Sequence, residues 1–243
     1  MSPRPRTRSR ATRQEQGKQD ILGAAAHLLA SHGYHGMSMR DLARETGMSL
    51  ANLYNYFASK EDLVFALQTR AFETLIVTAE QALEDLTAPE ARLYAFILNH
   101  VRYVTTNRDV TRVLVEEAGE LPAKRRAAVR ALKERYFRVA RAIVSAVGDS
   151  GCGVPGAKPL AALGPLTAAE IDRSTYNIFG MLNWIYGWHR ENEHGSAQDV
   201  ARSIHRLALC GLVARCPNSA IVSEMERHVG QFRVLSPVGV NAG

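Results

Sequence analysis

The chain has 243 residues, 46% of them hydrophobic, which is enough for one large domain or for a small domain joined to a larger one. No apolar run approaches the roughly 18 residues of a membrane span, and the basic N-terminus lacks the apolar stretch of a signal peptide. We therefore expect a cytoplasmic protein without a membrane partner. Three cysteines without CxxC spacing argue against a disulfide framework and a zinc site.

The basic character of the chain is concentrated at its beginning. The formal net charge is +6, and residues 1–18 carry +5 of it. Strongly basic segments are typical of solvated tails that contact the phosphates of nucleic acids without recognising particular bases. We expect residues 1–17 to form a disordered basic arm, which serves either DNA binding or solubility.

Three helices are predicted directly after this arm. The first covers about 18–31. Ser38 and Asp41 have the spacing of a capping box and open a second, short helix. The glycine-containing turn 47–49 separates it from a third helix over 50–56. The pattern is that of helix, turn, helix.

A longer fourth helix, 60–83, leads out of this small domain, and we place the domain boundary inside it. Since no long stretch alternates apolar and polar residues, the sequence predicts an all-α fold. The predicted domains are a helix-turn-helix domain 18–65, a larger helical domain 66–215 and a tail 216–243, with further helices over 89–106, 110–117, 123–147, 168–192 and 197–213 and a loop over 148–165.

The major groove of DNA is about 12 Å wide and admits one α-helix. A protein that reads this groove therefore presents a short, exposed helix, which a second helix anchors against the phosphates. In the helix 50–56, Leu53 is predicted to face the domain core. Asparagine makes paired hydrogen bonds to adenine, and small apolar side chains meet thymine methyl groups. An alternative places Tyr54 and Tyr56 in the core of a helix pair that does not bind DNA. The candidates facing DNA are Leu50, Ala51, Asn52, Tyr54 and Asn55, with Ser38, Arg40, Tyr56 and Lys60 suited to phosphates.

The run 21–63 contains GMSMRDLA, the turn GMS, LYNYF and SKEDL, and it resembles the N-terminal domain of TetR-family repressors. The resemblance implies an operator-binding regulator of double-stranded DNA in which the second and third helices meet DNA. The positions that it implicates are Ser38, Met39, Arg40 and Ser49, then Leu50, Ala51, Asn52 and Asn55 for base readout, and Tyr54, Tyr56 and Lys60 on the phosphate backbone.

A protein with one recognition helix gains affinity and specificity by pairing, so we expect a homodimer on a palindromic operator. The resemblance assigns the dimer contact to the last two long helices, which pack with their mates as a four-helix bundle. Alternatively, the apolar stripe along the last helix packs inside the core of its own chain. The candidate interface residues are Val200, Ile204, Leu207 and Gly211.

The predicted helix 168–192 is apolar on every side in YNIFGMLNWIYGWHR, which suggests a pocket wall on one face and a dimer contact on the other. Together with GSAQDVARSIHRLALCGL, this segment resembles repressors of fatty-acid or sterol breakdown that acyl-CoA thioesters release. The resemblance implies a small hydrophobic effector, acyl-CoA being the first choice. The candidate ligand residues are Phe179, Met181, Trp184, Tyr186 and Trp188 at the apolar end and Asn183, His189 and Arg190 at the polar end.

Other functions remain as alternatives. Gly187 stands where many members of the subgroup have an arginine, so another hydrophobic or aromatic effector stays open, as does corepression. GDSG at 148–151 superficially matches a serine-protease motif, but that fold is all-β, and we expect no enzyme, no catalytic residue and no cofactor. The histidines raise a metal-responsive regulator as a weaker alternative, but they lack the spacing of metal ligands, and no metal is expected.

Overall fold

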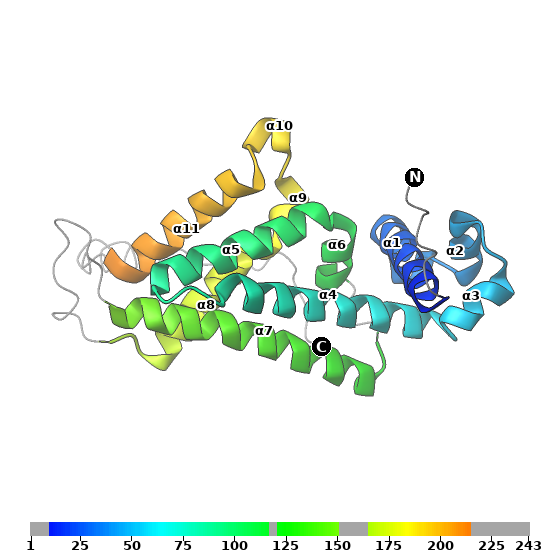
Figure 1. Ribbon diagram of the computed structural model, residues 1–243, viewed down its shortest axis with the longest axis horizontal. Coiled ribbons are helices and arrows are strands. Elements are labelled where there is room, and N and C mark those ends of the chain that lie inside the picture. The colour runs from blue at the N-terminus through cyan, green and yellow to red at the C-terminus, as the bar shows by residue number, and fades with distance from the viewer. Residues whose placement is uncertain (1–9, 117–120, 151–164, 215–243) are drawn as a thin grey trace, which may run out of the picture.

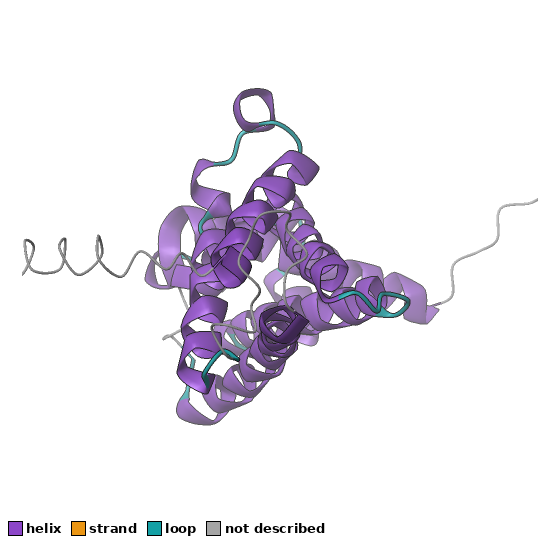
Figure 2. Ribbon diagram, turned by 90° about the vertical axis from the view of Figure 1, so that its left-hand side faces the viewer, coloured by secondary structure: helices purple, strands orange, loops and turns teal. Residues whose placement is uncertain are grey.

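The computed structural model describes residues 10–116, 121–150 and 165–214, and within these ranges it contains helices and no strands (Figures 1 and 2). This confirms the all-α prediction. Predictions for residues 1–9, for 151–164 of the loop and for the tail lie outside the described residues. The helices are α1 Arg10–Gly36, α2 Met39–Thr46, α3 Leu50–Tyr56, α4 Lys60–Leu83, α5 Pro89–Thr106, α6 Arg108–Glu116, α7 Ala123–Ser150, α8 Ala168–Asn183, α9 Ile185–Trp188, α10 Glu191–His194 and α11 Ala197–Ala214.

The small domain is held together by apolar side chains of α1, α2 and α3. Ile21, Leu42 and Leu53 are fully buried, and each comes from a different helix of the three. The chain leaves the helical conformation at Gly33, whose φ of 71° is tolerated best by glycine. Figure 1 shows this domain at one end of α4, which continues into the larger domain.

The first helix begins at Arg10 rather than near Lys18, so residues 10–17 are helical where a disordered arm was predicted. Glu15 explains part of the difference. Its carboxylate accepts a hydrogen bond from Gln19 one turn later, and it forms an ion pair with Arg70 of α4 at 3.0 Å. These contacts fasten the added turns to the rest of the molecule, although each is exposed and individually weak.

The larger domain packs α4, α5, α7, α8 and α11 side by side (Figure 1). Its core is built from the apolar faces of these helices, with Phe96 and Ile97 of α5 and Leu182 of α8 among the fully buried side chains. The helix α4 contributes to both domains. Its first turn is capped by Ser59, which accepts a hydrogen bond from the backbone of Asp62, as its sequence predicts.

The structure divides the predicted helix 168–192 into α8, α9 and α10. Arg108, at the start of α6, explains the end of α9, because its guanidinium donates to the backbone carbonyls of Tyr186 at 2.6 Å and His189 at 3.1 Å. Carbonyls at a helix end need such external donors. The short helix α9 packs against α5 and α6, and α10 packs against α11, so neither extends α8.

Candidate functional site

The second and third helices have the geometry of a helix-turn-helix. The side chain of Ser38 accepts from the backbone of Asp41 at 3.2 Å, and the carboxylate of Asp41 accepts from the backbone of Ser38 at 3.0 Å. The Ser38 hydroxyl also donates to the Asp41 carboxylate, and this hydrogen bond, together with that from the Ser38 backbone, lowers the pKa of Asp41. Gly47 then adopts a left-handed conformation, with φ 66°, and Ser49 caps α3 through the backbone of Asn52. The predicted capping box and turn are therefore present.

One face of α3 is free of intramolecular packing. Ala51, Asn52 and Asn55 are exposed, and the side chain of Tyr54 is 46% exposed. Leu53 points the other way and is fully buried, as expected from the sequence. Of the four side chains that were predicted to contact bases, those of Ala51, Asn52 and Asn55 are therefore exposed. Ser38, Arg40 and Ser49 at the helix starts are exposed as well.

Four of the remaining candidates are engaged inside the domain. Met39 is 8% exposed, so its side chain belongs to the core, and Leu50 is half-buried against it. The ammonium of Lys60 donates to the carbonyl of Met37 at 2.7 Å. Tyr56 is half-buried, with its hydroxyl so close to Gly17 that a Cβ there would lie 2.9 Å from it. The Lys60 ammonium has three donors, so two of them remain for a phosphate.

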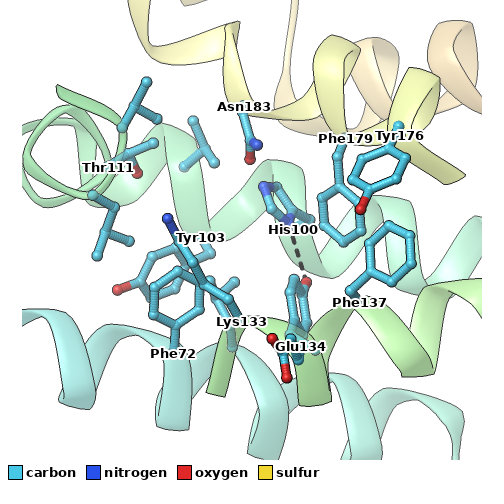
Figure 3. A pocket seen from close by; sticks show the side chains of 15 residues that line it. Phe72, His100, Tyr103, Thr111, Lys133, Glu134, Phe137, Tyr176, Phe179 and Asn183 are labelled. Atoms are coloured by element: carbon cyan, nitrogen blue, oxygen red, sulfur yellow. Dashed lines mark hydrogen bonds between the residues drawn. The ribbon is translucent and has the colours of Figure 1, made fainter. Parts of the chain in front are cut away.

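A cavity of about 430 Å³ opens in the larger domain between α4, α5, α6, α7 and α8 (Figure 3). This volume falls in the range of small-molecule sites, which bury most of a ligand's surface. Most of the wall is apolar or aromatic. The lining residues are Phe72, Leu75, His100, Tyr103, Val104, Thr111, Leu114, Val115, Lys133, Glu134, Tyr136, Phe137, Tyr176, Phe179 and Asn183.

A polar cluster interrupts the apolar wall. His100 Nδ1 lies 3.1 Å from the hydroxyl of Tyr136, and Asn183 lies beside the imidazole (Figure 3). Burial lowers the pKa of His100 to about 4, and it raises the pKa of Tyr136. Both groups are therefore neutral at pH 7. They offer hydrogen bonds to a polar atom of a ligand without offering it a charge.

The predicted ligand residues divide between this cavity and other places. Phe179 and Asn183 line the cavity. The Tyr186 hydroxyl instead donates to Glu116, and His189 is buried with Nε2 3.0 Å from the carbonyl of Gly195. The other predicted residues lie elsewhere: Arg190 is exposed, and Met181, Trp184 and Trp188 line a groove on the outer surface.

Sequence reasoning missed most of the cavity wall, including Phe72 of α4, His100 of α5 and Tyr136 of α7. One signal was available. His100 falls on the apolar stripe of α5 with Phe96 and Val104, so a polar side chain occupies a core position. Such a position suggests a buried hydrogen-bonding group, but spacing alone did not distinguish a structural histidine from one that faces a cavity.

The outer groove lies between α8 and α11 and carries an unusual amount of exposed apolar surface. Trp184 is 62% exposed, Leu207 61% and Tyr176 65%. Of the predicted dimer residues, Leu207 and Gly211 are exposed on α11. Val200 and Ile204 are mostly buried within the chain, and only their edges reach the groove.

Contacts between the two domains surround a second cavity of about 330 Å³, bounded by α1, α4, α5 and α6. His27 of α1 lies 3.1 Å from Asp109 of α6, and the ion pair between Arg70 and Glu15 joins α4 to α1. Tyr103 lines this interdomain cavity and also the larger one. One side chain is therefore the common wall of both.

No helix in the described ranges combines the length and apolar character needed to cross a membrane. In the same part of the chain, no three His, Cys, Asp or Glu side chains gather where they would hold a metal ion together.

Comparison with known proteins places both domains. Residues 21–67 match the family of bacterial regulatory proteins, tetR family, and residues 86–212 match the tetracyclin repressor-like C-terminal domain. The HTH-type transcriptional regulator HbdR of Aromatoleum sp. (strain CIB) is 26% identical over 137 residues, or 56% of this chain. That match spans 60% of HbdR, which is less than two thirds of its length.

Two further relatives have informative names. The fatty acid metabolism regulator protein of Bacillus subtilis (strain 168) is 21% identical over 131 residues, 54% of this chain and 68% of that protein. The crystal structure of AibR with isovaleryl coenzyme A and operator DNA aligns with a TM-score of 0.65 at 22% identity, covering 79% of this chain and 97% of AibR. At this identity the structural likeness concerns the fold.

Proposed function

The chain belongs to the tetR family of bacterial regulatory proteins, and on this basis we propose that it is a dimeric repressor which an apolar effector releases from a palindromic operator. Membership in a family of regulators confirms the expectation that the chain is not an enzyme. The observation that carries the proposal is the cavity of about 430 Å³. The helix α4 lines this cavity and also packs against the DNA-binding domain.

The exposed face of α3 supports operator binding. Asn52 and Asn55 lie on this face, and their amides suit adenine in the major groove. Ser38, Arg40 and Lys60 lie where helix ends approach the phosphate backbone, which positions the recognition helix without selecting bases. As an operator-binding regulator, the protein would act in the cytoplasm.

The cavity supports an effector with a large apolar part and a few polar atoms. Its aromatic wall encloses apolar surface, and the neutral cluster of His100 and Tyr136 offers hydrogen bonds to a carbonyl or hydroxyl. The first candidate is an acyl-CoA thioester, since the B. subtilis relative regulates fatty acid metabolism and AibR binds isovaleryl coenzyme A. Another hydrophobic or aromatic molecule is the alternative.

The groove between α8 and α11 supports dimerisation. An exposed tryptophan, Trp184, beside an exposed Leu207 is unfavourable in water and typical of a surface that another protein covers. A second copy of the chain on this face would supply the second α3 helix, and a palindromic operator requires two such helices about 34 Å apart, in successive turns of the major groove.

The test is a gel-shift titration of the protein on its own upstream DNA. We expect tight binding that long- or medium-chain acyl-CoA abolishes and that free CoA does not. Asn52→Ala should weaken binding about 10- to 100-fold, the size of one lost bidentate base contact. Asn192→Ala, at an exposed asparagine on α10 outside the groove, is the matched control. Binding that no acyl-CoA affects would reject this effector class, and Asn52→Ala without effect would reject the recognition face.

A further inference from the structure

Lys133 of α7 lines the cavity, and it lacks a counter-charge. Its ammonium lies 5.7 Å from the centroid of the Phe72 ring, and partial burial lowers its pKa. Within the described part of the chain Lys133 forms no ion pair. Because His100 is neutral, Lys133 is the positive charge among the described residues that line this cavity at neutral pH.

Two arginines of α7 are neutralised by neighbouring helices. Arg135 pairs with Glu80 of α4 at 2.6 Å, and Arg141 pairs with Asp172 of α8 at 2.6 Å. The chain thus supplies carboxylates to these two arginines and leaves Lys133, on the cavity face, without one.

Glu134 also lines the cavity and does not compensate Lys133. Adjacent residues on a helix point in different directions, so the two side chains do not face each other. In Figure 3 the amine nitrogen of Lys133 reaches toward Tyr103, away from the carboxylate of Glu134. The cavity therefore combines apolar walls with one ammonium that forms no ion pair in the described part of the chain and that is exposed at the opening of the cavity, where an anionic group of a ligand can reach it.

We propose that the effector carries an anionic group attached to its apolar body, and that Lys133 binds this group. The inference rests on the proposed function, because it concerns the same cavity. A carboxylate of an apolar acid and a phosphate of a CoA thioester share this chemistry. In either case the apolar body lies among Phe72, Phe137 and Phe179, with the anion at the ammonium.

A matched pair of fluorescent probes tests the proposal without DNA and without knowledge of the natural effector. 8-Anilinonaphthalene-1-sulfonate and N-phenyl-1-naphthylamine have the same aromatic body, and only the first carries an anion. We expect Lys133→Met to weaken the sulfonate probe about tenfold or more, as expected for a lost charge-assisted hydrogen bond, and to change the neutral probe less than about twofold. Lys133→Arg should restore the sulfonate probe.

Two variants locate the effect. Lys124→Met removes an exposed charge from the same helix outside the cavity, and it should leave both probes unchanged. Val115→Trp adds bulk to an exposed position in the cavity wall, and it should weaken both probes. Equal loss of both probes in Lys133→Met would show a structural role and overturn the proposal. Sulfonate binding unchanged by Lys133→Met would overturn it as well.

Displacement of the neutral probe identifies the source of the anion. If decanoate displaces the neutral probe from the wild type, and does so at least fivefold less well from Lys133→Met, the proposal is supported with a free acid as the source of the anion. The same dependence for decanoyl-CoA supports it with the phosphates as the source. Displacement by both compounds that is independent of Lys133 contradicts it. Failure of the repressor proposal itself would be seen separately, in the gel shift.

Discussion

At the scale of single residues, the buried histidine of the cavity has the clearest consequence. His100 is 3% exposed and is neutral because burial lowers its pKa to about 4. In the unfolded chain a histidine titrates near 6.5. The unfolded state therefore binds more protons between pH 6.5 and 4, and stability is complete above pH 6.5 and falls as the pH falls toward 4.

We predict that this loss of stability depends on His100. Replacing it by glutamine keeps a hydrogen-bonding side chain beside Tyr136 and removes the titration. Between pH 7 and pH 4.5 the wild type should lose up to about 3 kcal/mol more of its unfolding free energy than His100→Gln. Urea unfolding at the two pH values measures the difference. His32→Gln, at an exposed position of α1, is the control, and equal pH dependence in wild type and His100→Gln would contradict the assignment.

Single residues also show where sequence reasoning stops. The buried Leu53 and the exposed Asn52 and Asn55 follow from the period of one short helix, and the structure places them as predicted. Met39 was implicated in DNA contact by resemblance, and its side chain lies in the core. Whether one methionine at a helix start points inward depends on the packing of its neighbours, which a motif does not specify.

At the scale of helices, Arg108 has a central place. Its guanidinium donates to two backbone carbonyls at the end of α9, and these hydrogen bonds join α6 to α9. We predict that Arg108→Ala costs about 2 kcal/mol of unfolding free energy, because the donors are charged and the carbonyls are partly buried. Arg112→Ala, one turn later on α6 and in an exposed ion pair with Glu116, should cost clearly less. Chemical unfolding of both variants measures this, and equal costs would contradict the role of Arg108.

The helix boundaries divide into two classes. Those marked by a capping serine, as at Ser38, Ser49 and Ser59, could be predicted from the sequence because the cap is a local hydrogen bond. The break at Trp184 could not. The residues around it are apolar on every face, so no periodicity marked the end of α8, and the end of α9 that follows depends on Arg108, which is far away in the chain.

The same all-round apolar character explains the division of the predicted ligand residues. Phe179 and Asn183 point into the cavity, while Trp184 and Met181 point to the outer groove. A helix with apolar residues on every side fits a cavity on one face and a partner on the other, and the sequence predicted both roles. The sequence did not show which residues face the cavity and which face the partner, because that depends on how α8 is rotated about its own axis.

At the scale of the whole molecule, the outer groove predicts the oligomeric state. Trp184→Glu or Leu207→Glu should convert a dimer into a monomer with unchanged helix content, because a buried charge without a partner is unfavourable at an apolar interface. Operator affinity should fall at least tenfold. Sedimentation and circular dichroism measure the two properties. Val77→Glu, at an exposed apolar position on α4, is the control, and a dimer that persists in both groove variants would contradict this interface.

We expect coupling between the cavity and the DNA-binding domain, because the two share structural elements. The cavity is bounded by α4, which continues into the DNA-binding domain, and Tyr103 lines both the cavity and the space between the domains. An effector that fits one arrangement of these helices better shifts the population toward it. By linkage, DNA must then change effector affinity by the same factor that the effector changes DNA affinity, typically 5- to 150-fold, or about 1–3 kcal/mol.

The most direct test of the account is therefore the affinity of decanoyl-CoA, measured by displacement of N-phenyl-1-naphthylamine, with and without saturating operator DNA. The account predicts weaker effector binding by at least fivefold when the operator is bound, matched by an equal loss of operator affinity in the presence of effector. Tyr103→Ala should reduce this factor, and Tyr94→Ala, on the same helix outside the cavity, should not. Effector affinity that is the same with and without operator would contradict the proposed link between cavity and DNA.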